Sequence, residues 1–259
     1  MDCPTEFVDF AKLLARRSGD LIRPYFGGAD LRVDTKEDAS PVTEADRRAE
    51  ELMRTMIIDR YPEHGIVGEE FGSERPNAEW AWTLDPIDGT VSFAAGCPLF
   101  GTLISVQREG VPVLGVIHNP VLDQLCVGTE EGTTLNGRPT RVRETRSLAD
   151  AVLLATDVEN VAAYRKDVAA LGFAELRLGA RLFRTWGDCF GYVLLVSGGA
   201  DVMLDPIMNT WDLQPLIPIV RGAGGVITSW YGEDPVGADS CVASGPFLHA
   251  RVIETLSGR

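Results

Sequence analysis

The sequence predicts a layered fold that is α+β in its first half and α/β in its second half. Two segments with helical apolar periodicity open the chain, and a series of short apolar strands separated by turn residues follows them. In the second half, strand-like and helix-like segments alternate. A chain of 259 residues is long enough for one domain of two packed lobes, which we expect at residues 1–145 and 146–259.

The first helix is expected from Thr5 to Arg23. Its apolar side chains recur at helical spacing, at Phe7, Phe10, Ala11, Leu14, Leu21 and Ile22. Pro24 and the glycines that follow end the helix. The next segment, DLRVDTKEDASPV (30–42), is polar and predicts a mobile connector.

A second helix is expected to begin at Thr43, because Asp46 stands three residues later, as in a capping box. Its buried stripe is predicted at Ala45, Ala49, Leu52, Met53 and Met56. Pro62 closes the helix.

Short strands follow. GIVGEE and AWTLDP are typical of buried strands whose ends carry carboxylates, and LFGTLISVQREGVPVLGVIHNP predicts a hairpin that turns at Glu109–Gly110. After QLCVGT, further turns are expected at Glu131–Gly132 and Asn136–Gly137. In the second half we expect strands at AVLLAT, ADVMLD and GVITSW, and helices near 161–171, at GDCFGYVLLVSGG, at WDLQPLIPIVRGAGG and near 247–256.

Charge and composition disfavour several classes of partner. The 38 acidic and 24 basic residues give a net charge of −14, which argues against binding to nucleic-acid backbones or anionic membranes. No apolar run is long enough to span a bilayer. The five cysteines are scattered, and the three histidines stand in no metal-ligand spacing, so a zinc site is not expected. Free thiols in a reducing cytoplasm are expected instead.

Acidic side chains stand at the ends of two predicted strands, Glu69 and Glu70 after the first, Asp85 and Asp88 at the second. If both strands end at the same edge of a sheet, these carboxylates crowd together and repel one another unless a cation lies between them. Carboxylate oxygens are the ligands that Mg²⁺ selects. The alternative is a set of solvated acids at loop starts.

Gly89 and Thr90 favour the cation interpretation. Glycine lets a phosphate approach the backbone, and amides at a helix start point toward an anion. Pro86 is expected to fix a turn that brings Asp88 back toward Asp85. DPIDGT therefore predicts metal ligands on one side and a phosphate cradle on the other.

A further acid comes from the second half of the chain. NTWDLQPL predicts Asp212 as the N-cap of a helix, with Pro215 in its first turn. A capping role does not prevent Asp212 from also binding a metal. Pro218 lies deeper in the segment and is expected to kink the helix or make its start irregular.

In this order and at these separations, GEE, WTLDPIDGT and WDLQPLIPIVRGAGG resemble the motifs of the inositol monophosphatase family. The resemblance extends over essentially the whole chain, from DTKEDASPVTEAD to GAGGVITSW. It implies a single phosphatase domain built as an αβαβα sandwich, a homodimer, and Mg²⁺-dependent, lithium-sensitive hydrolysis of phosphate monoesters. It also implies two or three Mg²⁺ per active site, with Mn²⁺ as a substitute.

Carried over by position, the resemblance implies that Glu69, Asp85 and the backbone carbonyl of Ile87 bind a first Mg²⁺. Asp85 would bridge to a second ion that is also held by Asp88 and Asp212. Such ions would neutralise a phosphate that the negative net charge otherwise repels.

The same resemblance places the phosphate at Asp88, Gly89 and Thr90. Asp46 would accept a hydrogen bond from the Thr90 hydroxyl, and Glu69 and Thr90 would orient the attacking water for in-line displacement.

Two further positions follow from the resemblance. Glu70 would stand near a third metal site. Lys36 matches a lysine of the family, with a solvent-exposed side chain as the alternative. TVSFAAGCPLF, which contains the end of the DGT motif, has no basic residue, so the phosphate charge is left to metals and amides.

The leaving group is expected to be recognised by the second half of the chain. WGDCFGY resembles the histidinol-phosphate phosphatase branch of the family, which carries an aspartate at the Asp188 position; a helix N-cap is the alternative. Asp205 stands where inositol phosphatases carry a glutamate. Asn209 and Arg184 are additional candidates for substrate contact, with a turn residue and a surface ion pair as their alternatives.

The predicted function is therefore Mg²⁺-dependent hydrolysis of a small phosphate ester, with L-histidinol phosphate of histidine biosynthesis preferred. Acidic side chains suit its ammonium and imidazole groups, whereas inositol offers only hydroxyls. Inositol-1-phosphate and other sugar phosphates are the alternatives in the same reaction class. A non-catalytic metal-binding relative is the alternative from another class, although every implied ligand is present.

Overall fold

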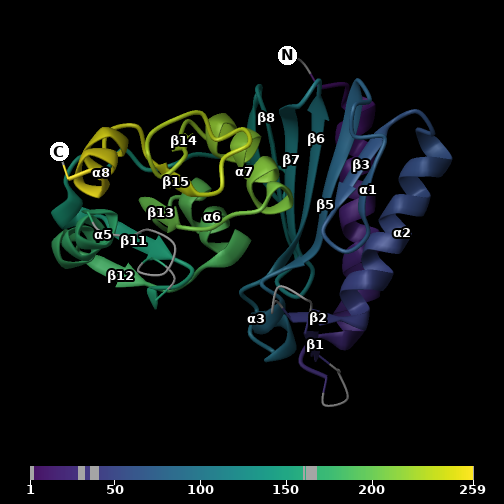
Figure 1. Cartoon of the computed structure of the whole chain (residues 1–259), viewed down its shortest axis with the longest axis horizontal. Coiled ribbons are helices and arrows are strands. Elements are labelled where there is room, and N and C mark those ends of the chain that lie inside the picture. The colour runs from purple at the N-terminus through teal and green to yellow at the C-terminus, as the bar shows by residue number, and fades with distance from the viewer. Residues whose placement is uncertain (1–2, 29–32, 36–40, 160, 162–167, 259) are drawn as a thin grey trace.

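The described strands form an eight-stranded sheet, a five-stranded sheet and a two-stranded hairpin. The structure, a computed structural model, describes residues 3–28, 33–35, 41–159, 161 and 168–258 (Figure 1). Lys36 and much of the connector predicted at 30–42 lie outside this part of the chain.

The helices are α1 Thr5–Ile22, α2 Glu44–Arg60, α3 Thr90–Ala94, α5 Val168–Gly179, α6 Asp188–Val196, α7 Thr210–Gly222 and α8 His249–Leu256, with 3-10 turns η1 Arg23–Tyr25 and η2 Leu148–Asp150. The strands are β1 Val33–Thr35, β2 Pro41–Thr43, β3 Gly65–Gly68, β4 Gly72–Glu74, β5 Trp80–Asp88, β6 Gly101–Arg108, β7 Val111–Asn119, β8 Gln124–Thr129, β9 Gly132–Leu135, β10 Arg138–Thr140, β11 Val152–Ala155, β12 Leu182–Arg184, β13 Val202–Asp205, β14 Val226–Thr228 and β15 Cys241–Ser244. No helix among the described residues is long and apolar enough to cross a membrane.

The elements stack in the order α-β-α-β-α (Figure 1). Helices α1 and α2 cover one face of the large sheet, whose strand order is β10-β9-β8-β7-β6-β5-β3-β4. Helices α6 and α7 lie between this sheet and the small sheet, whose order is β12-β11-β13-β15-β14. Helices α5 and α8 cover the outer face of the small sheet. The layered sandwich expected from the sequence is confirmed.

The central strands of the large sheet are apolar on both faces because helices cover both sides. Successive side chains of a strand point to opposite faces. In β6, Ile104 therefore packs with side chains of α1 and α2, whereas Leu103 packs with those of α6 and α7. Val116 and Ile117 of β7 divide in the same way.

Helix α7 approaches the large sheet closely because two strands carry glycine at the contact. A Cβ on Gly115 of β7 would lie 1.9 Å from the Pro215 carbonyl oxygen, and a Cβ on Gly128 of β8 would lie 2.3 Å from the Ile219 Cα. Contrary to expectation, Pro215 lies beyond the first turn, and α7 is one helix that contains both Pro215 and Pro218.

Both predicted dipeptide turns with a left-handed glycine are confirmed: Glu109–Gly110 joins β6 to β7, and Asn136–Gly137 joins β9 to β10. Each of these residues has a positive φ, as the tight hairpin turn requires. The third turn is shifted, because Gly132 already opens β9.

Other boundaries differ from the prediction. The segment 30–42 is more than a connector, since β1 and β2 pair in antiparallel fashion. Most of the range expected to be helical near 161–171 lies outside the described residues, which omit 162–167; α5, Val168–Gly179, covers only the end of that range and continues beyond it. Strands β12 and β15 were not predicted, because three- or four-residue strands show too little alternation to be recognised.

Candidate active site

The acids that follow β3 and β5 lie at the same edge of the large sheet. The two strands are parallel neighbours, with Gly68 opposite Leu84. The backbone N–H of Glu69 continues the ladder by donating to the Leu84 carbonyl at 3.2 Å. Glu69 is thus brought beside Asp85, as expected from parallel strands that end together.

Asp85 and Asp88 are brought together by a bulge, and the turn expected at Pro86 does not form. Pro86 and Ile87 stay within β5, whose pairing with β6 shifts register between Asp85 and Asp88. In a regular strand, side chains three residues apart point to opposite faces. The extra residue of the bulge reverses this alternation, so both aspartates reach the same side. The Ile87 N–H donates to Asp85 Oδ1 at 2.9 Å and fixes the bulged segment.

Asp212 reaches the same place from the start of α7. The N-cap is Asn209, and not Asp212 as predicted. The Asn209 N–H donates to Asp212 Oδ2 at 2.8 Å, which makes Asp212 the third helical residue of a capping box. The sequence NTWD offers two residues of capping type, and the pattern alone favoured the wrong one.

Asp85, Asp88 and Asp212 form an acidic cluster in which one carboxylate oxygen from each lies within 4.8 Å of the others. Burial raises the pKa of Asp85 well above its usual value, and the charges of Glu69, Asp88 and Asp212 raise it further. Burial also raises the pKa of Asp88, and it raises the pKa of Asp212 to about 6.

This cluster fits a hard divalent cation. The donors are carboxylate oxygens, which Mg²⁺ prefers over nitrogen or sulfur. A cation between them would relieve the repulsion that, together with burial, raises their pKa values. The backbone N–H of Cys189 in α6 donates to Asp88 Oδ2, so a second helix also helps to orient this cluster.

Thr90 and Asp46 lie beside the cluster. The Thr90 hydroxyl donates to the Ile87 carbonyl at 3.0 Å and lies 3.4 Å from Asp46 Oδ1, the long end of hydrogen-bond distances. Asp46 accepts the Thr43 N–H at 2.8 Å in the predicted capping box of α2. Burial raises the pKa of Asp46 to about 6, and the charge of Glu69 adds to this while hydrogen bonds from Thr43 oppose it.

Gly89 is the N-cap of α3 and has a left-handed conformation, with φ of 86°. Glycine adopts this conformation without steric cost. A Cβ here would lie 2.7 Å from the Leu99 carbonyl oxygen and 3.1 Å from Asp188 Oδ2. A larger residue at position 89 would therefore strain the backbone and crowd the site.

A cavity of about 210 Å³ opens beside the acidic cluster. It is lined by Asp88 and Asp212 of the cluster and by Asp157, Asp188 and Asp205. Tyr192, Ile207 and Leu216 add apolar surface. None of the described residues that line it is basic.

Asp188 lies at the start of α6 in an unusual backbone conformation, with φ of 49°. The N-cap alternative is wrong, because Gly187 is the N-cap. The Asp188 N–H donates to the Thr156 hydroxyl at 2.8 Å, which fixes the start of α6 to the end of β11. Burial raises the pKa of Asp188 to about 7, and the charges of Asp205 and Asp212 contribute. A left-handed aspartate held by its surroundings is typical of binding and catalytic sites.

Of the three other residues predicted to contact the leaving group, Asp205 and Asn209 line the cavity and Arg184 does not. Asp205 accepts the Tyr192 hydroxyl at 2.7 Å and the Thr156 N–H at 3.4 Å, so it holds β13, α6 and β11 together. Asn209 is exposed and lines the cavity. Arg184 is exposed in β12, donates to the Phe183 carbonyl at 2.7 Å, and is not among the lining residues.

Asp157 was not among the residues predicted at the site. It follows β11 almost directly, and its parallel neighbour β13 ends at Asp205. The rule that predicted the meeting of Glu69 and Asp85 applies to this pair of strands too. AVLLATD therefore contained the signal that places Asp157 at the cavity.

Known proteins resemble this chain over nearly its whole length. Residues 4–258 match the profile of the inositol monophosphatase family. A histidinol-phosphatase from Chlorobaculum parvum is 39% identical over 234 residues, covering 90% of this chain and 89% of that protein. A histidinol-phosphatase from Mycobacterium tuberculosis is 34% identical over 251 residues, covering 95% of this chain and 96% of that protein.

Comparison with solved structures indicates the same family. The structure of an inositol monophosphatase from Zymomonas mobilis has a TM-score of 0.87 and 34% sequence identity, and the match covers 99% of this chain and 100% of that chain. With the sandwich fold and the acidic cluster at one sheet edge, these similarities place the chain in the inositol monophosphatase family, a family of phosphoric monoester hydrolases.

Proposed function

We propose that this protein is a Mg²⁺-dependent phosphatase that hydrolyses L-histidinol phosphate to L-histidinol, a step of histidine biosynthesis. The observation that carries the substrate assignment is the acidic lining of the cavity by Asp157, Asp188 and Asp205, without a basic residue among the described lining. The ammonium and imidazolium groups of histidinol phosphate complement such a lining. The similarity to histidinol-phosphatases supports the same substrate.

The proposed ligands of one Mg²⁺ are Glu69, Asp85 and the Ile87 carbonyl, and those of a second are Asp85, Asp88 and Asp212. When bound, Mg²⁺ would supply positive charge that neutralises the phosphate ester and would lower the pKa of a water molecule, which makes that water a better nucleophile. Mn²⁺ accepts the same oxygen ligands and is expected to substitute. Glu70 is proposed to stand near a third, weaker site, and Li⁺ is expected to compete for one of the positions.

The side chains near the cluster are proposed to orient water and phosphate. Because the Thr90 hydroxyl proton is donated to the Ile87 carbonyl or to Asp46, the lone pairs of this hydroxyl can accept a hydrogen bond from the attacking water. The Glu69 carboxylate accepts the other hydrogen of that water. The amides of Gly89 and Thr90 donate to the phosphate. As the water oxygen bonds to phosphorus, the P–O bond to the leaving alkoxide breaks, and the alkoxide takes up the proton that the attacking water loses, which gives histidinol and inorganic phosphate.

The leaving group is proposed to occupy the cavity. Asp188 and Asp157 bind its cationic groups, Asn209 contacts its polar edge, and Tyr192 and Ile207 pack against the flat imidazole ring. Asp205 contributes by holding the walls of the cavity in place.

A panel of phosphate monoesters tests this assignment. The expected result is a kcat/KM for L-histidinol phosphate at least about tenfold above that for inositol-1-phosphate, since one well-placed charge pair contributes on the order of 1.5–3 kcal/mol. EDTA should abolish both activities. Equal or reversed values of kcat/KM would favour an inositol-1-phosphate phosphatase or a broad sugar phosphatase. The similarity to the Zymomonas mobilis inositol monophosphatase supports this alternative. No turnover of any ester with Mg²⁺ present would indicate a non-catalytic relative.

We further propose a cytoplasmic homodimer in which residues 1–145 and 146–259 are the two lobes of each subunit. All five cysteines, which lie within the described residues, are free thiols, as is usual in a reducing compartment. Size-exclusion chromatography with light scattering tests the dimer, and a mass near the monomer's 28.1 kDa would contradict it.

A further inference from the structure

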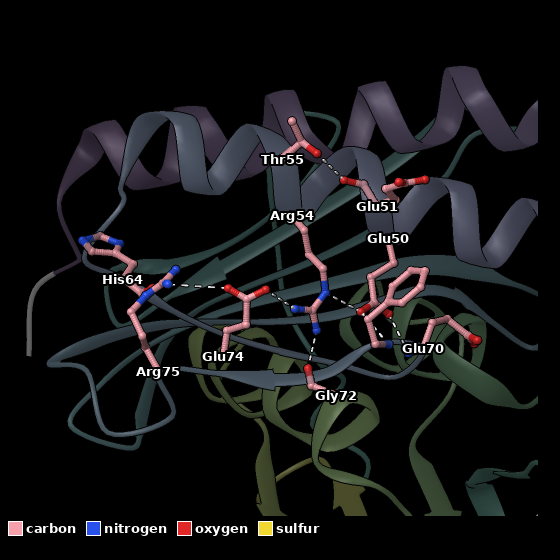
Figure 2. A network of polar contacts seen from close by, with 10 residues as sticks. Glu50, Glu51, Arg54, Thr55, His64, Glu70, Gly72, Glu74 and Arg75 are labelled. Carbon is pink, nitrogen blue, oxygen red and sulfur yellow. Dashed lines mark hydrogen bonds and ion pairs between the residues drawn. The ribbon is translucent and has the colours of Figure 1, made fainter.

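A buried acid on α2, Glu50, contacts the backbone segment that carries Glu69. Glu50 is 0% exposed, whereas its neighbour Glu51 is exposed. Figure 2 shows Glu50 and Arg54 extending from α2 toward the hairpin formed by β3 and β4. No sequence motif had assigned a function to this pair.

The Glu50 carboxylate binds two consecutive backbone amides. Its Oε2 accepts the N–H of Glu70 at 2.7 Å, and its Oε1 accepts the N–H of Phe71 at 3.2 Å. Hydrogen bonds to a charged acceptor are roughly twice as strong as those between neutral groups. The segment directly after Glu69 is thus fixed by a side chain from another element.

Arg54 holds the Glu50 carboxylate in place. Its Nε donates to Glu50 Oε1 at 2.7 Å, and a terminal nitrogen donates to the Gly72 carbonyl (Figure 2). A further nitrogen lies 3.6 Å from Glu74 of β4. The buried acid is therefore paired with a buried base, and both are tied to the hairpin.

The hairpin is shaped to admit this carboxylate. A Cβ on Gly68 would lie 1.9 Å from Glu50 Oε1. Position 68 must therefore lack a side chain if Glu50 is to reach the amides beyond it. The last residue of β3 and the buried acid of α2 fit only as a pair.

The two peptide groups that flank the Cα of Glu69 are both held. The Glu69 N–H donates to Leu84 of β5, and the Glu70 N–H donates to Glu50. Fixing both peptide planes fixes the backbone dihedral angles of Glu69 and hence the direction of its Cα–Cβ bond, from which the side chain extends. Only the second of these bonds depends on a side chain.

We propose that Glu50 is a positioning residue for the metal centre, which sets the orientation of Glu69 through the 69–70 peptide. The proposal rests on the metal site described under the proposed function. Residues that orient metal ligands typically change metal affinity by about 10–100-fold when they are replaced.

The test compares Glu50→Gln with Glu51→Gln, a matched change at the exposed neighbouring position of the same helix. Glu50→Gln keeps the shape of the side chain but removes the charge that holds two amides and Arg54. Binding of Mn²⁺ alone is measured by electron paramagnetic resonance at a temperature where both variants are folded. We expect the Kd for Mn²⁺ to rise about 10–100-fold in Glu50→Gln and to stay unchanged in Glu51→Gln.

Hydrogen exchange of the Glu70 and Phe71 amides is the second readout, and both amides should exchange faster in Glu50→Gln. If that variant does not fold, Arg54→Lys keeps a buried positive charge but loses the guanidinium geometry, and it should weaken Mn²⁺ binding in the same direction. A purely structural role would lower the melting temperature and leave the Mn²⁺ affinity of the folded protein unchanged.

The outcomes separate the two proposals. Unchanged Mn²⁺ affinity in Glu50→Gln, with normal binding by the unsubstituted protein, would overturn the role of Glu50 alone. Absence of Mn²⁺ binding in the unsubstituted protein would overturn the metal site, and the role of Glu50 with it.

Discussion

An oxygen of the Asp85 carboxylate in β5 lies within 4.8 Å of an oxygen of the Asp212 carboxylate in the first turn of α7. β5 belongs to the large sheet, whereas α7 lies between the two sheets and packs against β7 and β8 at Gly115 and Gly128. The acidic cluster therefore exists only when α7 is docked on the sheet. Docking of α7 and assembly of the proposed metal centre are one event.

Replacement of Asp85 by Asn should abolish most of the activity while the fold remains. Asp85 is shared by both proposed metal positions, so the loss of its charge removes several kcal/mol of charge stabilisation and should lower kcat/KM at least about 100-fold. Burial raises the pKa of this carboxyl, so the neutral amide should not lower the melting temperature of the metal-free protein. Asp59→Asn, on the exposed face of α2, is the control, and near-normal turnover by Asp85→Asn would refute the bridging role.

Replacement of Asp188 by Asn should change substrate preference more than the chemical step. The half-buried Asp188 carboxylate lines the cavity beyond the acidic cluster, so its charge is proposed to act on the leaving group. We expect kcat/KM for L-histidinol phosphate to fall roughly 10–100-fold, the effect of one lost charge-assisted contact. The value for inositol-1-phosphate should change little, and equal losses for both substrates would show that Asp188 acts on the phosphate or the metals instead.

The stability of the metal-free protein should fall as the pH rises. The pKa values of Asp46, Asp188 and Asp212 are raised to about 6, 7 and 6 from 3.8, mainly by burial. The folded protein therefore binds protons more tightly than the unfolded chain, so this stability is complete below about 3.8 and is lost as the pH rises through about 6 to 7.

Mg²⁺ binds the ionised cluster and should offset that loss. The increase in melting temperature on adding Mg²⁺ to EDTA-treated protein should be larger at pH 8 than at pH 5. Differential scanning fluorimetry at both pH values measures it. The same increase at both would mean that the acids do not release protons on metal binding.

Replacement of Gly115 by Ala should weaken metal binding from a distance. The new methyl group would lie 1.9 Å from the Pro215 carbonyl oxygen, so α7 must shift away from the sheet and carry Asp212 with it. Overpacking of this kind costs about 1–3 kcal/mol of stability. The Mg²⁺ concentration for half-maximal activity should rise as well, whereas Val111→Ala at the exposed start of β7 should change neither. Lost stability with unchanged Mg²⁺ activation would separate α7 docking from the metal centre.

The sequence predicted those parts of the candidate site that are encoded by short continuous motifs. GEE and DPIDGT each place their acids at the end of a strand, and parallel strands of one sheet bring such ends together. The predictions that failed concerned local backbone geometry, because the same residue types occur in more than one kind of turn, bulge or helix cap. Pro86 was expected in a turn but lies in a bulge, and both Asn209 and Asp212 are residues of capping type, of which the sequence favoured the wrong one as the N-cap.

Contacts between distant elements were harder to predict. Glu50 and Arg54 stand four residues apart, a spacing typical of an exposed ion pair on a helix surface. They lie among the buried positions of α2, beside Ala49, Met53 and Ile57. Their place next to these apolar residues in the sequence was the available signal that they face the sheet. Their partners on the β3–β4 hairpin could not be deduced without the fold.

The most direct test of the proposed metal centre is a crystal structure of the protein grown with Mn²⁺, with the metal located by anomalous scattering. We expect anomalous density contacted by Asp85 together with Asp88 and Asp212, in crystals of protein that hydrolyses L-histidinol phosphate. Active protein whose crystals show no metal density at these carboxylates, with the side chains turned away from one another, would contradict it.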